Sequence, residues 1–327
     1  MISVSVIVPV YKAELFFEKC LRSLFDQTLA NIEYIFIDDS TPDASMKILN
    51  DVLLEYPERK DFVRVFTNVS NLGSGATRAV GMKLARGEYV IHCDSDDWCE
   101  PDMYEQMYKV AVSENADIVC CDISMEYIGR SVCNRYKYAI ETRQHLLELK
   151  LDLLYSSLCN KLIRRSLYQE YNVSFFEDVN MWEDLGLMTR LRYFSKKTVI
   201  VSKALYHYNK QNAQSIASVP KVCKIEEQMR CASMLGDFFE NKEQFSIVSD
   251  YLKFMAKSAF LYSKVIRDTE RWKKTFPETH KFIWHYTNLS WEMRLEFWLA
   301  SKGFAKFVSA IIDTKVYINS ELQKVRC

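Results

Sequence analysis

The sequence lacks several features that would assign it to a common class of protein. It has no net charge, because 43 lysines and arginines balance 43 aspartates and glutamates, whereas nucleic-acid binding needs a basic surface. No apolar run approaches the roughly 18 residues that a membrane-spanning helix requires. The ten cysteines form no CxxC pair and no zinc-binding spacing. We therefore expect a protein with reduced thiols that binds no nucleic acid and spans no membrane.

Signals for export and repetition are missing as well. Met1 leads directly into a strand-like segment, so we expect no signal peptide and a cytoplasmic location. The sequence contains no internal repeat and no low-complexity stretch. Its 327 residues are enough for one large domain with an appendage, or for two domains.

Short apolar runs alternate with helical patterns over the first 122 residues. The runs are rich in β-branched residues and are bounded by turn residues, which is typical of buried strands. The predicted strands are Ser3–Val10, Ile32–Ile37, Val63–Thr67, Tyr89–Cys93 and Ile118–Asp122. Apolar residues at helical spacing predict helices at Leu15–Gln27, Ala44–Tyr56, Ala76–Ala85 and Met103–Asn115. This alternation predicts an α/β fold whose mostly parallel sheet is covered by helices on both faces.

The remainder of the chain has a different pattern. Beyond Arg130 the spacing is helical, with an irregular middle part rich in aromatic residues. From Val222 onward the pattern is helical throughout, and Gly236 and Gly303 are its only glycines. We therefore expect an α-helical C-terminal region after the α/β part.

Acidic residues follow two of the predicted strands. Asp38 and Asp39 come directly after the second strand, and Asp94-Ser95-Asp96-Asp97 follows the fourth. Parallel strands have their carboxyl ends at the same edge of a sheet, where α/β proteins bind ligands. Sequence order therefore brings two distant carboxylate groups to one rim.

The Asp94–Asp97 segment has the composition of a metal site. Three carboxylates in four residues repel one another unless a cation or hydrogen-bond donors offset the charge. Oxygen ligands at a strand end suit Mg²⁺ or Mn²⁺, which leave positions open for the phosphates of a nucleotide. The alternative is a solvated acidic turn that caps the helix near Pro101. The apolar strand that precedes the segment favours the metal site.

Two further carboxylates fit such a site. Asp39 could accept hydrogen bonds from a base or a ribose, while Asp43 in the same segment caps the next helix. A transfer reaction at a metal-bound nucleotide needs one more carboxylate to deprotonate the acceptor hydroxyl. Asp184 is the candidate, and we expect its neighbour Glu183 to point away from the same cleft. The alternative is a pair of helix N-terminal charges that face water.

Several segments together resemble the family 2 glycosyltransferases with the GT-A fold. The resemblance covers roughly Ile2–Ser218. The segments that carry it are Val4–Tyr11 (VSVIVPVY), Leu24–Gln27 (LFDQ), Ile37–Asp43 (IDDSTPD), Asn71–Gly73 with Arg78, Gly87–Asp97 (GEYVIHCDSDD) with Pro101, Asn160–Leu162, Glu183-Asp184 and Leu205–Tyr208 (LYHY). The resemblance implies an inverting enzyme that moves a sugar from a nucleotide diphosphate donor, with UDP expected, to an acceptor hydroxyl. The expected product is a polysaccharide or glycolipid of the cell envelope or capsule.

The resemblance also implies which residues bind the donor nucleotide. They are Pro9, Val10, Tyr11, Asp39, Arg78, Asp94, Lys161 and His207. The first four would bind the nucleobase and its ribose, partly through the backbone. Arg78 would support the donor pocket, and Lys161 and His207 would contact the diphosphate.

The remaining implied roles concern the metal and the base. Asp96 and Asp97 would be the metal residues, with Mn²⁺ or Mg²⁺ bridging the diphosphate, and Asp94 would contact the ribose or the metal. Asp184 would be the catalytic base. The family's usual glycine after the two aspartates is Ser40 here. This departure removes no acidic residue, so we expect an active enzyme.

The expected organisation follows the extent of the resemblance. Residues 1–218 would form the catalytic domain, with 1–122 as the nucleotide-sugar half and 123–218 as the acceptor half, and 219–327 would form the helical region. A nucleotidyltransferase is one alternative, but such enzymes open with a glycine-rich basic loop, and Pro9–Ala13 contains no glycine. A non-catalytic nucleotide-sugar-binding protein is the other, and it would not need Asp184.

The helical tail is rich in aromatic residues and carries a small positive charge. From Val219 onward it has 18 lysines and arginines against 13 aspartates and glutamates. One interpretation is a helix that contacts the inner face of an anionic membrane, where a lipid-linked acceptor would lie. The other is packing on the catalytic domain or on a second subunit of a homo-oligomer. Glu292 and Glu296 dilute the basic face, which favours packing.

Overall fold

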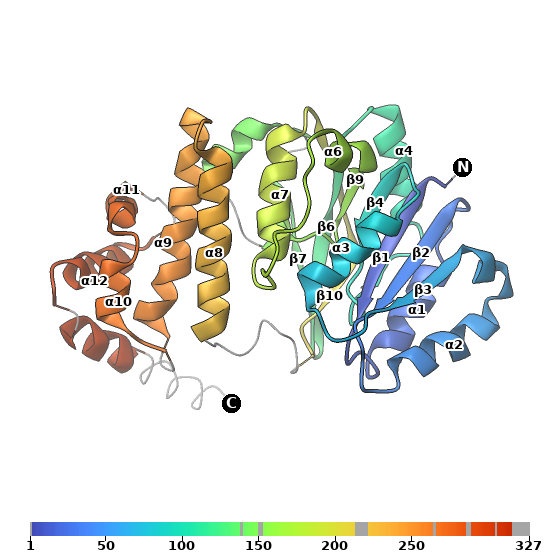
Figure 1. Ribbon diagram of the computed structural model, residues 1–327, viewed down its shortest axis with the longest axis horizontal. Coiled ribbons are helices and arrows are strands. Elements are labelled where there is room, and N and C mark those ends of the chain that lie inside the picture. The colour runs from blue at the N-terminus through green and yellow to red at the C-terminus, as the bar shows by residue number, and fades with distance from the viewer. Residues whose placement is uncertain are drawn as a thin grey trace. The chain divides into compact units, whose positions relative to one another are not determined.

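The chain divides into two compact units, Met1–Ser215 and Ile216–Cys327 (Figure 1). The computed structural model describes residues 2–137, 140–149, 153–212, 222–263, 266–285, 289–304 and 306–315. The domain boundary predicted after residue 218 lies outside the described residues.

A mixed sheet forms the centre of the first unit. Its strand order is β3-β2-β1-β4-β9-β6-β10-β5, with β7 beside β6 and β8 beside β10. The strands are β1 (Val4–Val10), β2 (Ile32–Asp38), β3 (Val63–Thr67), β4 (Tyr89–His92), β5 (Trp98–Cys99), β6 (Ile118–Tyr127), β7 (Arg130–Asn134), β8 (Ile140–Glu141), β9 (Lys161–Arg164) and β10 (Thr198–Asn209). Strands β3, β2, β1 and β4 are parallel, as are β6 and β10, whereas β9 lies antiparallel between β4 and β6.

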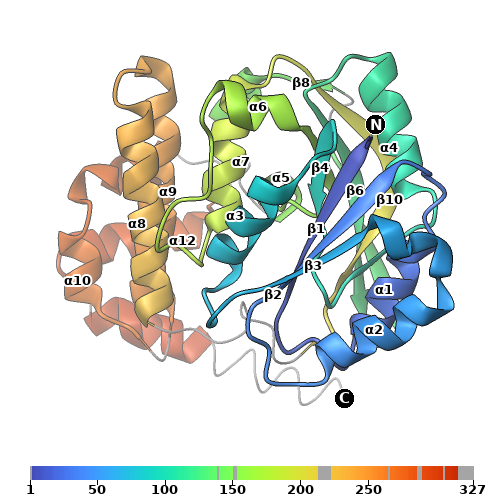
Figure 2. The same ribbon diagram turned by 45° about the vertical axis from the view of Figure 1, so that its right-hand side comes forward.

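Helices cover both faces of this sheet. In the first unit they are α1 (Phe17–Phe25), α2 (Ser45–Glu55), α3 (Ser74–Leu84), α4 (Met103–Ser113), α5 (Leu153–Ser156), α6 (Arg165–Glu170) and α7 (Glu183–Phe194), with 3-10 turns at Pro57–Phe62 and Arg143–Glu148. Figures 1 and 2 show α3, α6 and α7 on one face and α1, α2 and α4 on the other. The α/β fold that the sequence predicts is confirmed.

Strand β1 shows how the sheet separates two apolar layers. Successive side chains of a strand point to opposite faces. Val4, Val6 and Val8 pack in a core that also contains buried residues of α1, α2 and α4. Ile7 packs on the other face with Ala85, which follows α3. The continuous apolar run in the sequence is therefore the consequence of burial on both faces.

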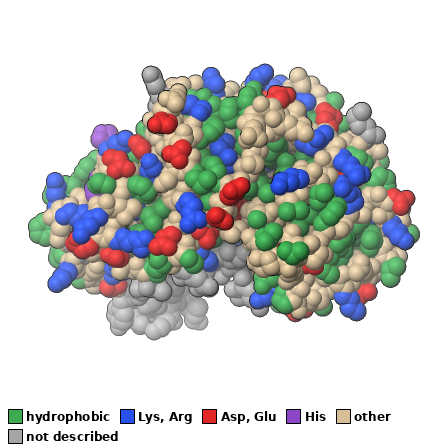
Figure 3. Space-filling view, in the orientation of Figure 1, with side chains coloured by type: hydrophobic (Ala, Val, Ile, Leu, Met, Phe, Trp, Pro, Cys, Tyr) green, Lys and Arg blue, Asp and Glu red, His purple; other side chains and the backbone are tan. Residues whose placement is uncertain are grey.

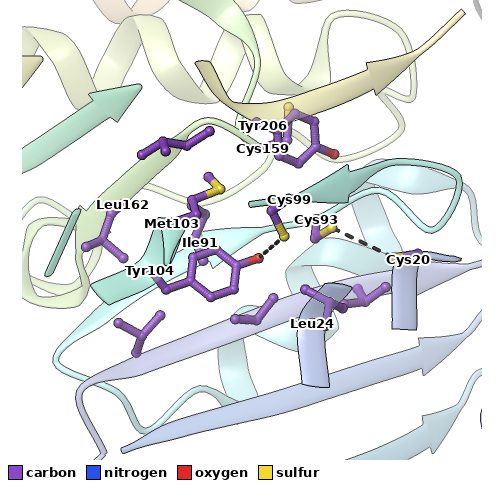
Figure 4. Close-up of a cluster of buried hydrophobic side chains, with 14 of the residues drawn as sticks. Cys20, Leu24, Ile91, Cys93, Cys99, Met103, Tyr104, Cys159, Leu162 and Tyr206 are labelled. Carbon is purple, nitrogen blue, oxygen red and sulfur yellow. Dashed lines mark hydrogen bonds between the residues drawn. The ribbon is translucent and has the colours of Figure 1, made fainter. Parts of the chain in front are cut away.

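Buried thiols belong to the first of these cores, close to the end of β4. The sulfur atoms of Cys20 and Cys93 are 3.9 Å apart, and the Cys99 thiol donates to Tyr104 Oη at 3.6 Å (Figure 4). Hydrogen bonding to Cys93 and burial raise the pKa of Cys99 well above its usual value. A neutral buried thiol packs as a small apolar side chain, so these cysteines contribute to the core.

The prediction of a helical pattern beyond Arg130 is wrong for part of that region. Strand β10 has 12 residues and pairs with both β6 and β5. Its β-branched start and aromatic end favour a strand. The register with β6 shifts between Val201 and Ala204 and again before Tyr206. Such irregularities interrupt the alternation of buried and exposed residues that identifies a strand in a sequence.

The second unit is helical, as its sequence pattern predicts. Its helices are α8 (Val222–Phe239), α9 (Ser246–Tyr262), α10 (Thr269–Lys274), α11 (Phe282–His285) and α12 (Trp291–Ser301), with helical residues at 306–315 and 3-10 turns at Glu243–Phe245 and Pro277–Lys281. Its core includes Phe254, Trp272 and Phe297, all fully or almost fully buried. None of the described helices of the protein has the length and apolarity that crossing a membrane requires. Acidic and basic side chains are interspersed over the face drawn in Figure 3.

Gly87 connects α3 to β4 at a point where the backbone is crowded. A Cβ atom at this position would lie 2.6 Å from Ser5 N and 2.8 Å from both Tyr89 O and Val4 C. The Gly87 N–H also donates to Ser5 Oγ at 2.8 Å. Because these neighbours are backbone atoms of the sheet, they cannot move aside as a flexible side chain would.

We expect Gly87→Ala to lower the free energy of unfolding by about 1–3 kcal/mol, the usual effect of overpacking. Thermal melting followed by circular dichroism measures the change. Gly236→Ala is the control, because the nearest neighbour of a Cβ there would be the flexible end of Lys253 at 3.3 Å and alanine is the better helix residue. A Gly87→Ala protein that melts at the wild-type temperature would contradict this account of the crowding.

Candidate functional site

The acidic residues predicted to share a rim follow neighbouring strands. Strand β1 lies between β2 and β4 and is parallel to both. Asp38 is the last residue of β2, Asp39 follows it, and Asp94 comes two residues after the end of β4. The carboxyl ends of these strands therefore bring the two acidic segments to one edge of the sheet.

The guanidinium of Arg78 joins three elements at this edge. Arg78 lies on α3 and is almost completely buried. It donates to Asp94 Oδ1 at 2.5 Å and to Glu183 Oε1, in the first turn of α7, at 2.7 Å. Ser74 at the start of α3 also donates to Glu183 Oε1, at 2.7 Å. One cation thus lies between two carboxylates that are 89 positions apart in the sequence.

Asp184 lies beside this ion-pair network, at the start of α7. Carboxylates in the first turn of a helix are stabilised by its dipole, and Leu185 N donates to Asp184 Oδ1 at 2.6 Å. Burial and then the charge of Glu183 raise the pKa of Asp184 to about 7, although Arg78 opposes the shift. A carboxylate with a pKa near neutrality can accept and release protons at physiological pH.

Residues of β10 hold the acidic turn that follows β4. Asp97 is buried, and it accepts hydrogen bonds from Tyr206 Oη at 2.6 Å and from Asn209 N at 2.8 Å. Tyr206 Oη in turn accepts from Asp94 N at 3.2 Å. Asp96 is half-buried, and its Oδ2 accepts from Asn212 Nδ2 at 2.8 Å. Burial and the charge of Asp94 raise the pKa of Asp96, as expected where carboxylates gather without enough donors.

Asp94, Asp96 and Asp97 differ in how much of each carboxylate is exposed to a divalent cation. Asp94 and Asp96 are half-buried, whereas Asp97 is buried and has one protein donor on each oxygen. Ligand atoms of Asp94, Asp97 and Cys159 lie within 4.8 Å of one another. This trio suits Mg²⁺ or Mn²⁺ poorly, because hard cations prefer oxygen and burial raises the pKa of the Cys159 thiol well above its usual value. Asp97 shapes the turn through these two hydrogen bonds, and its role as a metal ligand remains a prediction.

Asp39 lies at the predicted rim, where it anchors a neighbouring loop. Its carboxylate accepts hydrogen bonds from Asn68 Nδ2, Leu72 N and Gly73 N at 2.8–3.0 Å. Gly73 has a φ of 85°, which favours glycine. Ser40 also takes a left-handed conformation, with a φ of 54°, and donates to Asn68 O at 2.6 Å. The contact of Asp39 with a base or ribose remains a prediction.

The three residues at the end of β1 that are predicted to contact the base differ in how much side-chain surface is accessible to a nucleotide. The side chain of Val10 is fully buried, and its carbonyl accepts from Asp39 N at 3.0 Å. Val10 therefore has no free side-chain surface for a nucleotide. Tyr11 is 40% exposed, and Pro9 is half-buried. Among the three, the aromatic ring of Tyr11 is the surface on which a base can stack.

The predicted diphosphate contacts of Lys161 and His207 are not supported by the structure. Lys161 is buried, and its ammonium donates to Leu154 O, Ser157 O and Asn160 Oδ1 at 2.6–2.8 Å. All three of its protons are therefore used within the protein.

The ring of His207 is likewise occupied by protein partners. Its Nδ1 lies 2.8 Å from Glu126 Oε1, and its Nε2 lies 2.8 Å from Glu100 Oε1. The ring also stacks on Trp98, with 5.3 Å between the ring centroids. Neither ring nitrogen is free to bind a phosphate.

Three residues of the site have contacts that the sequence pattern does not predict. Glu183 was expected to point away from the site. Instead, it forms an ion pair with Arg78. Tyr206 and Asn209 hold Asp97 from β10. Recognition of β10 as a strand would have found Tyr206, because adjacent strand residues such as Tyr206 and His207 point to opposite faces.

Comparisons of the whole sequence with known proteins point to one family. The family described as Glycosyl transferase family 2 matches residues 5–171. EpsH of Bacillus subtilis (strain 168), assigned as a glycosyltransferase, is 33% identical over 63% of this chain and 60% of its own length. EpsJ of the same organism, an uncharacterised glycosyltransferase, is 30% identical over 69% of this chain and 66% of its own length. The chain thus spans about three fifths to two thirds of these relatives.

A solved structure has a similar fold over almost the whole chain. It is that of S. aureus TarS 1–349 in complex with UDP-GlcNAc. The TM-score is 0.69, with 18% sequence identity, over 97% of this chain and 92% of that one.

We expect Lys161→Met to lower the melting temperature and to leave the KM for a sugar-nucleotide donor unchanged at temperatures well below the melt. The variant removes three buried hydrogen bonds, and unsatisfied buried acceptors cost about 1–3 kcal/mol each. Steady-state kinetics and thermal melting of the same preparations separate the two effects. A several-fold rise in KM with unchanged melting would restore the predicted role of Lys161 in binding the diphosphate.

Proposed function

The chain belongs to glycosyl transferase family 2, and on that premise we propose that it transfers a sugar from a UDP-sugar to an acceptor hydroxyl with inversion of configuration. The observation that carries the proposal is the network of Arg78 with Asp94 and Glu183, beside which lies Asp184 with a pKa of about 7. We further propose that the product is a cell-envelope polysaccharide or glycolipid, and that residues 1–218 carry the catalytic site.

The donor assignment is supported by chemistry and by the structural neighbour. The TarS structure contains UDP-GlcNAc, and the present chain offers an exposed aromatic ring at Tyr11 at the end of β1. Asp94 and Asp96 would hold Mg²⁺ or Mn²⁺ at the same edge of the sheet. A bound divalent cation supplies stabilisation of the negative charge that develops on the departing diphosphate.

Asp184 is proposed as the base that activates the acceptor. It takes the proton of the acceptor hydroxyl while the hydroxyl oxygen bonds to the anomeric carbon of the sugar. The bond from that carbon to the diphosphate breaks on the opposite side, and its electron pair leaves with the diphosphate. The configuration at the anomeric carbon is therefore inverted. Arg78, with its charge offset by Asp94 and Glu183, keeps the carboxylates of the site in position.

We expect UDP to bind more tightly in the presence of Mn²⁺ or Mg²⁺, and Asp96→Ala to remove this enhancement. Isothermal titration calorimetry with UDP, with and without EDTA, measures both effects. Asp51→Ala on α2 is the control, because Asp51 is exposed and pairs only with Lys47 among the described residues. If the affinity for UDP were unchanged by EDTA and by Asp96→Ala, the metal assignment would be wrong.

We expect Asp184→Asn to keep the fold and the affinity for UDP but to reduce sugar transfer by roughly 10²–10⁴-fold, the usual contribution of a positioned acid–base group. The amide has nearly the same shape as the carboxylate but cannot accept the proton. Transfer to an acceptor is measured beside donor hydrolysis by water, which persists at a low rate. Full transfer activity in Asp184→Asn would show that another group is the base. A wild-type protein without transfer activity would favour a non-catalytic nucleotide-sugar-binding role.

The pH dependence of kcat/KM provides a test that is independent of the size of the loss. A base must be deprotonated, so activity should fall as the pH drops below the pKa of Asp184, about 7. Glu183 is the charged neighbour that raises this pKa, so Glu183→Gln should move the acid limb to lower pH while also weakening the hold on Arg78. An acid limb at the same pH in the wild type and in Glu183→Gln would show that another group titrates.

A further inference from the structure

Exposed aromatic residues gather in the last part of the second unit. On α12, Trp291 is 72% exposed, and Leu295 and Trp298 are 40% and 37% exposed. These positions are spaced i, i+4 and i+7, so they share one face of the helix. Phe297 and Ala300 on the opposite face are buried. The outer face of α12 is thus apolar where a surface helix of a water-soluble protein is normally polar.

Further aromatic residues flank this helix. Trp284, Phe304 and Phe307 are each more than half exposed. Trp284 is close to α12, because its carbonyl accepts a hydrogen bond from Arg294 Nη1. We call the exposed set the aromatic face; it consists of Trp284, Trp291, Leu295, Trp298, Phe304 and Phe307. A gathering of large apolar side chains on a surface usually marks an interaction site.

In the sequence, two glutamates argue against a membrane contact, but the structure shows that neither presents a free charge at the surface. In the sequence, Glu292 and Glu296 dilute the positive charge of this segment. Glu296 is in fact buried, where it accepts from Tyr262 Oη at 2.9 Å and from Lys315 Nζ at 2.7 Å. Glu292 pairs with the same lysine at 2.8 Å. One glutamate is therefore withdrawn from the surface, and the other is paired.

Positive charges next to the aromatic face remain available. Lys302 follows Trp298 by four residues and so lies on the same side of the chain, and Lys306 lies between Phe304 and Phe307. Both are exposed, and within the described part of the chain neither forms an ion pair. Lys273 reaches the same stretch, with its Nζ 3.7 Å from the position of a Cβ on Gly303.

We propose that the aromatic face, with Lys302 and Lys306, binds the surface of an anionic phospholipid bilayer. Tryptophan and phenylalanine enter the region between headgroups and acyl chains, and adjacent lysines are attracted to anionic headgroups. A second copy of the chain is a poorer match. A two-fold contact would place the same patch against itself, and the aromatic face contains no acidic residue to pair with the lysines of a second copy. The contact is peripheral and requires none of the donor-site residues.

Vesicle flotation of the full-length protein tests this proposal. We expect wild type to float with phosphatidylcholine vesicles that contain phosphatidylglycerol, and less so as salt concentration rises. Trp291→Ser combined with Trp298→Ser should reduce the bound fraction at least about 10-fold. Lys302→Glu combined with Lys306→Glu should abolish the preference for anionic vesicles. Leu54→Ser on α2 is the matched control, because Leu54 is 82% exposed and lies in the other unit.

The alternative results are distinct from one another. Three results would each overturn the proposal. The wild type could fail to float, it could bind vesicles with and without phosphatidylglycerol equally, or the double tryptophan variant could bind as well as the wild type. A dimer that forms in solution and is lost in the tryptophan variant, without vesicle binding, would assign the face to a second copy. UDP binding is measured on every variant and should stay at the wild-type level. Failure of the membrane proposal therefore leaves the proposed sugar transfer intact, and the reverse also holds.

Discussion

The arrangement of the site depends on the two ion pairs of the buried Arg78 guanidinium. Asp94, Glu183 and Asp184 come from two segments that would repel each other at the edge of the sheet. Arg78 bonds to the first two at 2.5 and 2.7 Å, so α3, the end of β4 and the start of α7 are held by one charge. Loss of one partner from a buried ion pair leaves a charge without compensation, which costs about 3–5 kcal/mol. The position of Asp184 therefore depends on Arg78, which pairs with its neighbour Glu183.

The sequence predicts the first half of the Met1–Ser215 unit well, because the signals there are local. Strands β1 to β4 are short apolar runs between turn residues, and each acidic segment follows directly after one of them. Topology then places Asp39 and Asp94 at one edge without any knowledge of side-chain contacts. The sequence does not predict β10, because its register with β6 shifts twice and these shifts disturb the alternation by which strands are identified.

The roles of individual side chains are harder to predict, because they depend on contacts that a sequence pattern does not reveal. Lys161 is a basic residue in a glycosyltransferase-like motif, yet three acceptors from its own neighbourhood take all its protons. The segment Leu205–Tyr208 points to His207, whereas it is the neighbouring Tyr206 that bonds to the acidic turn. Burial distinguishes these two residues of β10, because Tyr206 is buried and His207 is half-buried. The pairing of Glu183 with Arg78 spans 105 positions, and no local pattern reveals it.

Left-handed backbone conformations occur in three loops beside the strands and helix of the site, and they restrict which residues these positions accept. Lys12, Ser40 and Trp182 adjoin β1, β2 and α7, and all three have left-handed φ values, between 52° and 68°. Such a conformation costs an L-amino acid roughly 1–2 kcal/mol, and that cost is met when the chain folds. The same strain narrows the residues that evolution can use at these positions: glycine, asparagine and aspartate fit, and valine and isoleucine do not.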